Sequence, residues 1–292
     1  MQARSWLAIA IVTISAGGAT LYGLNLNPSK HLPRLKVTQA DIDALIDRTY
    51  EQMVFVEGGE FLMGDIMHDG LYSTWGDDNK PAVKVSLDSY SIGAYEVSYG
   101  DFDIYTAAND LPGTLDEDWA VGQEWRKPEY PAGTSWTGAK NYCLWLAEIT
   151  GEPFDLPTEA QWEYAARSRG LDVIYATDDG TIRPGENYEN DANHPLPSGT
   201  FPPNPLGLYD MSGNIADWVN DWYDEDYYKN MPKTNPTGPE AGTHKIVRGG
   251  TYAETFTGSN VIARGEIDDI EQEYRLAGVR CVLNLKEPAA DS

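Results

Sequence analysis

The hydrophobic pattern of the chain consists of short apolar runs separated by turns, with a few longer segments at helical spacing. Residues 53–56 and 61–64 are two such runs on either side of residues 57–60, which read Glu-Gly-Gly-Glu, so we expect a β-hairpin with a Gly-Gly turn. Residues 82–87 alternate between apolar and polar side chains, which is typical of a half-buried strand. The last third, which ends in the run 276–283, indicates short strands joined by long turns.

Two helices are indicated mainly by their capping residues. Thr38 precedes a short helical segment that carries Asp41 at its third position, the spacing of a capping box. Ser98 can cap a helix that runs through Phe102 and Tyr105. Both starts depend only on local chemistry.

Two further helices have clearer apolar faces. The first is expected to end at Gly151, and its apolar residues recur at three- and four-residue spacing: Trp136, Ala139, Cys143 and Leu146. The second begins at Thr158, which has capping-box spacing to Gln161, and Gly170 is expected to close it.

The start of the chain predicts export. A short basic start is followed by residues 6–24, which carry no charge and are apolar or small, so we interpret 1–24 as a signal peptide or a membrane anchor. Residues 25–50 are expected to be a linker and a short helix, 51–286 a single folded domain and 287–292 a tail. The expected location is therefore periplasmic or otherwise extracytoplasmic, with a possible membrane tether through the N-terminal segment.

The amino-acid composition and the net charge limit which folds and which binding partners we expect. The chain contains 28 Gly, 18 Pro, 9 Trp and 18 Tyr among 292 residues, which favours a loop-rich domain with an aromatic core over a disordered chain. Its formal net charge of −25 repels phosphate backbones, so we expect no nucleic-acid partner. The same charge would attract Ca²⁺ and cationic ligands, or simply keep the protein soluble.

Six strings of the sequence, taken in order, resemble the sulfatase-modifying-factor domain, also called the formylglycine-generating-enzyme domain. They are Gly58-Gly-Glu-Phe-Leu-Met-Gly, Tyr95-Glu-Val-Ser, Leu156-Pro-Thr-Glu-Ala-Gln-Trp-Glu-Tyr-Ala-Ala-Arg, Asn204-Pro-Leu-Gly-Leu-Tyr-Asp-Met-Ser-Gly-Asn, Val247-Arg-Gly-Gly-Thr-Tyr and Gly278-Val-Arg-Cys. The resemblance covers about residues 53–285 and implies an irregular, loop-rich α+β fold related to C-type lectins. That fold hosts several activities, so it does not by itself choose one.

The resemblance also locates the residues that decide the chemistry. Formylglycine generators bind Cu(I) through two thiolates just after the Arg-Gly-Gly motif, because soft sulfur ligands select Cu(I). Counted from Arg248, these positions fall on Glu254 and Ser259, and the chain has only two cysteines, both in other motifs. We therefore expect neither copper nor formylglycine chemistry, and the residues indicate no particular redox cofactor.

Glu254 is the candidate catalytic residue. The resemblance implies that it lies at the floor or rim of the substrate groove, beside Tyr252 and Thr251. A carboxyl in a partly apolar groove can have a raised pKa and act as an acid or a base. Alternatively, Glu254 is an exposed glutamate or an ion-pair partner of Arg248 or Arg264, and Arg248 serves mainly to hold loops together.

A calcium site is also implied by the resemblance. The family holds Ca²⁺ with two side chains and two carbonyls of this motif, which here are supplied by Asp210, Gly213, Ile215 and Asp217. All are the hard oxygen ligands that Ca²⁺ prefers. A second family site begins at an asparagine for which Asn187 is a candidate, although the segment after it is shortened and its other ligands have no clear match.

The resemblance further implies a disulfide between Cys143 and Cys281, and an exported protein would meet the oxidising conditions that allow it. Two buried free thiols are the alternative. A second family disulfide would need cysteines near Ala166 and Arg264, and both are missing.

The functional expectation has two forms. In the first, the protein is an exported enzyme that modifies a small molecule or peptide in its groove, resembling the branch of the family that matures the pyoverdine chromophore by oxidative tailoring. In the second, it is a non-catalytic ligand-binding or scaffold protein of the cell envelope.

Overall fold

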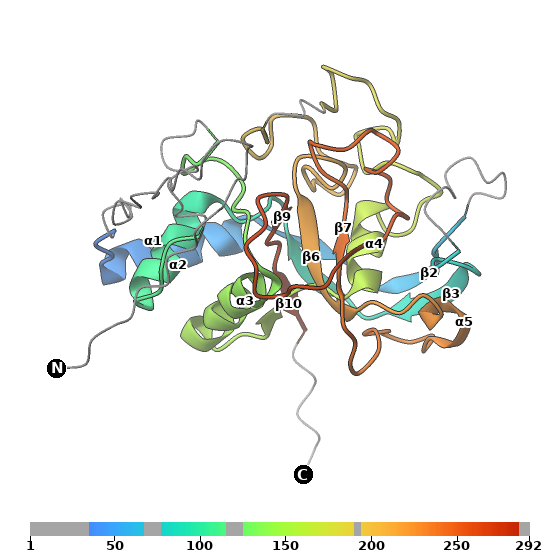
Figure 1. Ribbon diagram of the computed structural model, residues 1–292, viewed down its shortest axis with the longest axis horizontal. Coiled ribbons are helices and arrows are strands. Elements are labelled where there is room, and N and C mark those ends of the chain that lie inside the picture. The colour runs from blue at the N-terminus through green and yellow to red at the C-terminus, as the bar shows by residue number, and fades with distance from the viewer. Residues whose placement is uncertain (1–34, 67–76, 115–124, 190–193, 286–292) are drawn as a thin grey trace, which may run out of the picture.

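The computed structural model describes residues 35–66, 77–114, 125–189 and 194–285, which form an irregular α+β fold with long connecting loops (Figure 1). The helices are α1 (Gln39–Glu51), α2 (Tyr99–Ala108), α3 (Trp136–Thr150), α4 (Glu159–Ala166) and α5 (Tyr227–Asn230). The strands are β1 (Met53–Val56), β2 (Gly59–Met63), β3 (Val83–Leu87), β4 (Tyr90–Gly93), β5 (Phe154–Asp155), β6 (Ala216–Trp222), β7 (Lys245–Arg248), β8 (Gly265–Ile267), β9 (Ala277–Gly278) and β10 (Val282–Asn284). The fold class expected from the sequence is confirmed.

The expected targeting segment, residues 1–24, and the expected tail, residues 287–292, lie outside the described residues. Within the ranges that the structure describes, no helix combines the length and apolar character that a membrane crossing requires.

Strands β1 to β4 form one long antiparallel ribbon that bends in its middle. β1 pairs with β4, with Val56 opposite Tyr90. The same register continues where β2 pairs with β3, with Gly59 opposite Leu87. The expected hairpin between β1 and β2 is therefore wrong, although both strands exist. A Cβ at Gly58 would lie 2.4 Å from the carbonyl oxygen of Leu87, so this glycine serves the close approach at the bend and not a hairpin turn.

Two four-stranded sheets organise the rest of the domain. The first has the order β1-β4-β10-β5, and the second has the order β8-β7-β6-β9. In the second sheet β6 runs antiparallel to β7 and parallel to β9. Figure 1 shows β6 and β7 at the centre of the molecule, and both contact α4. The second sheet thus carries the Arg-Gly-Gly motif, which begins at Arg248, the last residue of β7.

The helix starts predicted from capping residues are confirmed. The side chains of Thr38 and Thr158 complete capping boxes at α1 and α4, and Ser98 accepts a hydrogen bond at the start of α2. α3 ends at Gly151, which has the left-handed conformation that glycine adopts readily.

α4 ends earlier than expected, at Ala166 and not near Gly170. The backbone already has positive φ at Ser168 (46°) and Arg169 (69°). Arg167, at the C-cap, is completely buried, and its Nη1 donates a hydrogen bond of 2.6 Å to a backbone carbonyl of β2. The helix therefore ends where Arg167 makes its tertiary contacts. The position of Gly170 in the sequence did not predict this earlier end.

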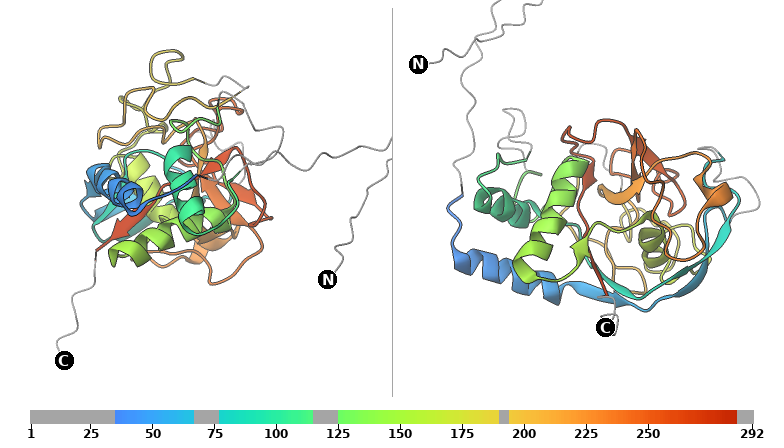
Figure 2. Two further views of the ribbon diagram at one scale, coloured as in Figure 1. Left: turned by 90° about the vertical axis from the view of Figure 1, so that its left-hand side faces the viewer. Right: turned by 90° about the horizontal axis from the view of Figure 1, so that it is seen from below.

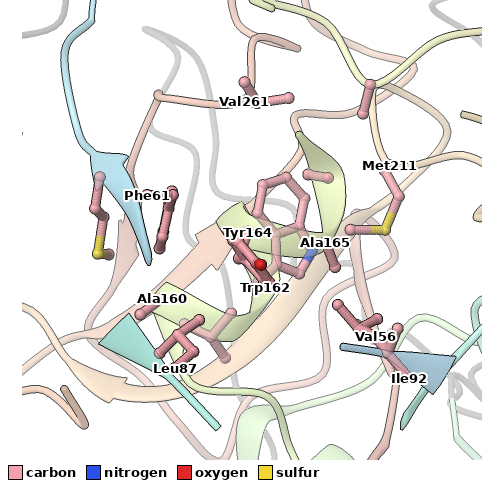
Figure 3. Packing of buried hydrophobic residues seen from close by; sticks show 14 of the residues in the cluster. Val56, Phe61, Leu87, Ile92, Ala160, Trp162, Tyr164, Ala165, Met211 and Val261 are labelled. Atoms are coloured by element: carbon pink, nitrogen blue, oxygen red, sulfur yellow. The ribbon is translucent and has the colours of Figure 1, made fainter. Parts of the chain in front are cut away.

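The larger core surrounds α4 almost completely. Trp162 is 0 % exposed, and the rings of Tyr164 and Phe61 lie 5.0 Å apart between centroids. Figure 3 shows Trp162 and Tyr164 of α4 packed among Leu87 and Phe61 of the bent ribbon and Met211. Large aromatic side chains dominate such a core because each removes a large apolar area from water.

A second core lies between α2, α3 and the first sheet, on the side of the molecule that the left view of Figure 2 presents. The rings of Phe102 and Tyr142 stack with centroids 5.6 Å apart. A disulfide joins Cys143 of α3 to Cys281, which directly precedes β10, with 5.7 Å between the Cα atoms. The expected disulfide is therefore confirmed, and it ties the helices to the last strand of the sheet.

Candidate functional site

A groove of about 250 Å³ opens along the second sheet. Its walls come from β6, β7 and β8, from the loop that follows β7, and from the segment that leads into β9. Apolar side chains make most of its surface, among them Val247, Ile267, Leu276 and Ala277. Glycines at 250, 258 and 265 also border the groove and leave its walls open.

Glu254 brings a carboxyl group into this groove. A Cβ at Gly258 would lie 2.3 Å from Oε2 of Glu254, so the carboxyl group folds back against that glycine. The turn is held by hydrogen bonds from Glu254 N to Thr251 O (3.1 Å) and from Gly258 N to Thr255 O (2.8 Å). The residue as a whole is exposed, but partial burial of its carboxyl group raises the pKa of Glu254 above its usual value. Partial burial thus favours the protonated form of this carboxyl group more than in a fully solvated glutamate.

Ser259 occupies the second position at which the resemblance implies a thiolate. It is 0 % exposed, and its Oγ lies 3.0 Å from the hydroxyl oxygen of Tyr188. A Cβ at Gly250 would lie 2.6 Å from Ser259 Cα, so the serine sits directly behind the groove wall. A carboxylate and a hydroxyl are hard oxygen ligands, and therefore Glu254 and Ser259 do not form a site suited to Cu(I).

The structure brings only part of the predicted catalytic set together. Thr251 borders the groove with Glu254. Tyr252 is buried and faces a different, much smaller cavity of about 20 Å³, which Asp210 and Asn187 also line. Arg248 is 1 % exposed and lies in the interior between β7 and α4.

Arg248 belongs to a buried ion-pair network below the groove. Its Nη1 donates to Glu159 (2.6 Å) and its Nη2 to Glu163 (2.9 Å), both on α4. Arg264 donates from Nε to the same oxygen of Glu159 (2.8 Å). Burial alone would raise the pKa of Glu159, but the charges of Arg264 and Arg248 outweigh it and hold that pKa below its usual value. The network is a structural element, and its charges are already compensated.

Two aromatic residues, Tyr274 and Trp218, connect the groove to the core. Tyr274, which falls just after the acidic run 266–273, borders the groove, and the sequence interpretation missed it. Its ring packs edge-on against Trp218, with 6.1 Å between centroids. Trp218 itself is 0 % exposed and belongs to the core. Tyr274 directly follows the acidic run, and its contact with the distant Trp218 left no local signal in the sequence.

The loop 210–217, which was expected to bind calcium, is hydrogen-bonded to the backbone segment that follows β7. Gly213 N donates to Gly249 O (2.9 Å), and Tyr252 N donates to Asn214 O (2.7 Å). The loop therefore helps to position the backbone that carries Thr251 and Glu254.

Asp210 and Asp217 are the carboxylates of this loop. They could coordinate a cation only together with backbone carbonyl oxygens. Asp217 is 1 % exposed; its Oδ2 accepts from Trp162 Nε1 (2.8 Å) and Arg280 Nε (2.9 Å), whereas its Oδ1 is buried without a hydrogen-bond partner. Burial raises the pKa of Asp210 to about 6, and the charge of Asp217 adds to this shift. In the described part of the chain no three His, Cys, Asp or Glu side chains are grouped so that they could hold a metal ion.

The side chain of Asn187 is used within its own loop. Its Oδ1 accepts from Arg183 N (2.7 Å), and its Nδ2 donates to Asp178 Oδ1 (2.8 Å) and Thr181 O (3.0 Å). The guanidinium of Arg183 pairs with Asp178 at 2.9 Å and so supplies a positive charge at this place. These contacts do not fit a second calcium ion held by Asn187.

Comparison with known proteins identifies the family. The model of the sulfatase-modifying factor enzyme 1-like domain matches residues 38–285. The chain is 29% identical over 265 residues to the serine/threonine-protein kinase pkn1 of Chlamydia pneumoniae, covering 83% of this chain but only 40% of that protein. It is 28% identical over 260 residues to the formylglycine-generating enzyme of Streptomyces coelicolor, covering 70% of this chain and 80% of that enzyme.

A solved structure gives the same result for the fold. PvdO from Pseudomonas aeruginosa matches with a TM-score of 0.67 and 25% identity, covering 80% of this chain and 94% of PvdO. The groove, the loop after β7 and the loop 210–217 all lie within the matched residues 38–285. The chain belongs to the sulfatase-modifying factor, or formylglycine-generating-enzyme, family.

Proposed function

We propose that the protein is an exported member of this family that does not generate formylglycine and instead modifies a small molecule or peptide outside the cytoplasm, by oxidative tailoring in its groove. The similarity to PvdO supports this branch of the family. Glu254 and Ser259 stand where two thiolates would be needed, which argues against the copper-dependent reaction. The uncharged segment 6–24 and the disulfide are consistent with export.

The observation that carries the proposal is the carboxyl group of Glu254 in an otherwise largely apolar groove. We assign to it the proton transfer that accompanies modification of the substrate. Burial raises the pKa of Glu254 above its usual value, a direction that favours retention of a proton for transfer to the substrate. Thr251, on the same wall, is placed to orient the substrate. We assign Arg248 and Tyr252 to holding the loop and not to contact with substrate.

The proposal is tested with a variant that changes charge and little else. Glu254→Gln should lower turnover of the native substrate by about 10²–10⁴-fold, as loss of an acid–base group does. Glu240→Gln, at an exposed position outside the groove, is the matched control and should leave turnover unchanged. In parallel, mass spectrometry should find no formylglycine in a sulfatase-type cysteine peptide, with or without copper. Full turnover by Glu254→Gln, or conversion of that peptide, would refute the assignment.

The groove also supports a second candidate, a ligand-binding or scaffold protein of the cell envelope. Its lining is mostly apolar side chains and glycines, a surface that needs no chemistry to bind a ligand. This candidate predicts that a ligand isolated with the protein is released unchanged and that Glu254→Gln alters affinity alone.

We also propose that the loop 210–217 binds one structural Ca²⁺. The ligands would be the side chains of Asp210 and Asp217 and the carbonyl oxygens of Gly213 and Ile215. The buried Oδ1 of Asp217 supports this, because an unpartnered carboxylate oxygen is costly in the interior. The ion would supply charge compensation for two nearby carboxylates.

A further inference from the structure

A second cavity, of about 280 Å³, lies between α1, α2, α3 and the loop around Ser198. Among the described residues, none borders both this cavity and the groove along the second sheet. Figure 1 shows α1 and α2 on one side of the central strands β6 and β7. The cavity is therefore a separate place at which the domain can hold a ligand, and the reaction proposed for the groove does not use it.

The cavity reaches a hydroxyl group that has no partner in the protein. Tyr142 of α3 is 2 % exposed, and no described residue forms a hydrogen bond with its hydroxyl group. The hydroxyl oxygen is not fully enclosed, so the small exposed part of the residue opens on the cavity that Tyr142 lines. A buried hydroxyl group that lacks a hydrogen bond is costly, and a ligand oxygen in the cavity would remove that cost.

The hydroxyl group of Tyr142 is held at a defined position. Its ring stacks on Phe102 with 5.6 Å between centroids, and it meets Tyr105 edge-on at 5.5 Å. Burial raises the pKa of Tyr142 well above its usual value, and the charge of Asp101 adds to this shift. The hydroxyl group thus keeps its proton and can donate it in a hydrogen bond. A fixed donor of this kind favours a ligand with an acceptor oxygen at one defined point.

The charges around the cavity favour a neutral ligand. Asp101 accepts a hydrogen bond of 2.5 Å from Arg48, and the carboxyl group of Glu96 lies 3.9 Å from the buried guanidinium of Arg280. Glu129 is exposed and also lines the cavity. These carboxylates would repel an anion, whereas the two arginines already compensate two of them.

The mixture of donors and acceptors favours a ligand that is rich in hydroxyl groups. Tyr142 supplies a donor, Gln52 supplies both a donor and an acceptor, and the carboxylates of Asp101 and Glu129 supply acceptors. An alcohol group both donates and accepts, so a molecule with several alcohol groups can satisfy all of these side chains at once. The volume lies just below the ~300–1,000 Å³ of pockets for drug-sized molecules, which suits a single ring.

We propose that the cavity between α1, α2 and α3 binds a small neutral molecule with several hydroxyl groups, the size of one sugar ring, and that Tyr142 donates a hydrogen bond to one of its oxygens. Leu146, which also lines the cavity, offers an apolar contact to the C–H groups of such a ring. This site is independent of the groove and of the function proposed for it.

The test compares probes that differ in hydroxyl content and charge. D-Glucose, D-galactose and D-mannose are the neutral, hydroxyl-rich probes, and the uronate of the best-binding hexose is the anionic one. Cyclohexanol keeps a six-membered ring with one hydroxyl group, and cyclohexylamine is its cationic counterpart. Dissociation constants are measured on the full chain by ligand-observed NMR at an ionic strength of about 0.15 M, where exposed charges act over only ~8 Å.

At least one hexose should bind with a Kd below ~10 mM, and the other three kinds of probe should bind at least about tenfold more weakly. Tyr142→Phe should weaken the hexose about tenfold, as expected for the loss of one hydrogen bond. Its Tm without ligand should not fall, because no hydrogen bond within the protein is lost. Gln52→Trp, at an exposed position that lines the cavity, should weaken the hexose by blocking access to it.

Tyr105→Phe is the matched control. It removes a hydroxyl group from the same aromatic cluster, but Tyr105 does not border the cavity, so hexose binding should stay unchanged. An equal loss in Tyr105→Phe would attribute the effect to packing of the cluster and would refute the site.

Other results would also overturn the inference. Absence of binding by all three hexoses would do so, as would equal or tighter binding of cyclohexanol, cyclohexylamine or the uronate. Hexose binding that survives both Tyr142→Phe and Gln52→Trp would place the sugar elsewhere on the protein. A clear fall in the Tm of ligand-free Tyr142→Phe would show that the hydroxyl group serves the fold, and the assignment of Tyr142 to a ligand would fail.

Discussion

The ion-pair network below the groove and the groove itself place two carboxylates in opposite surroundings. Glu159 is 1 % exposed and shares its oxygens between Arg248 and Arg264, which hold its pKa below the usual value. Glu254 lies six positions after Arg248, is exposed as a residue, and has a pKa that burial of its carboxyl group raises. Two arginines favour the charged form of Glu159, whereas burial favours the protonated form of Glu254. The segment 248–254 therefore contains both a supporting arginine and the carboxyl group to which we assign the chemistry.

The network also connects segments that the family resemblance would join by a second disulfide. That bridge would need cysteines near Ala166 of α4 and at Arg264. In the structure, Arg264 instead contacts Glu159, at the other end of α4, through Nε (2.8 Å) and Nη2 (3.2 Å). A buried, fully bonded arginine thus links α4 to the segment before β8. Losing one partner of such a pair is costly because the other charge stays buried alone.

The largest expected effect comes from breaking the network. Arg248→Met keeps much of the length of the side chain but leaves Glu159 and Glu163 with less compensation, so the free energy of unfolding should fall by about 3–5 kcal/mol. Urea denaturation measures it. Lys84→Met, which breaks the exposed pair with Glu60, is the control and should change stability by less than ~1 kcal/mol. A loss below ~1 kcal/mol in Arg248→Met would show that the network is not the support described here.

Removal of calcium should have the next largest effect and should reach the groove. At a free Ca²⁺ concentration 100 times Kd, binding to the folded state alone stabilises it by about 2.7 kcal/mol, so chelation should lower Tm visibly. Because the loop bonds Gly249 and Tyr252, chelation should also weaken binding in the groove. Asp217→Asn should bind less Ca²⁺. An unchanged Tm on chelation, with no calcium found by elemental analysis, would refute the site.

Local chemistry made much of the fold predictable. The starts of α1, α2 and α4 follow from one hydroxyl side chain each, and predicting them needed no knowledge of distant segments. The pairing of β1 and β2 was not predictable in this way, because their partners lie about thirty positions further along the chain. A Gly-Gly pair permits a turn or a close crossing equally well, and only the tertiary contact of Gly58 with Leu87 distinguishes them.

The sequence predicted those site residues whose distance along the chain from a recognisable motif is fixed. Counting from Arg248 located Glu254, which borders the groove. The same count could not separate Thr251, which borders the groove, from Tyr252, which is buried behind it, because adjacent residues point in different directions. Tyr274 reaches the groove through its contact with Trp218, a relation between distant segments that carries no local signal.

A third carboxylate, Asp221, is buried and gives a pH-dependent effect on stability. Asp221 is 2 % exposed, its Oδ2 accepts from Glu159 N (2.9 Å), and burial followed by the charge of Glu159 raises its pKa to about 7. Its pKa in the unfolded chain is about 3.9. Between these values the unfolded state has lost the proton and the folded state retains it, so this group's contribution to stability falls as pH rises from about 4 to 7.

Asp221→Asn should remove that decline, since an amide oxygen can still accept from Glu159 N. Relative to the unmodified protein, the variant should gain in Tm between pH 5 and pH 8, as measured by calorimetry at both values. A constant difference between the two proteins across this range would mean that Asp221 ionises normally in the folded state.

Replacement of Glu254 should have the smallest effect on stability. This result would distinguish the groove from the ion-pair network most clearly. Glu254→Gln should change the free energy of unfolding by no more than ~0.5 kcal/mol, because the residue is exposed and its carboxyl group lies against Gly258 at the surface loop after β7. The raised pKa sets the sign: ionised Glu254 is slightly disfavoured in the folded state, so the neutral variant should be equal or marginally more stable at pH 7. Calorimetry beside the Arg248→Met variant measures the contrast directly. If Glu254→Gln were instead destabilised as much as Arg248→Met, Glu254 would belong to the structural network, and its assignment as the working carboxylate of the groove would fail.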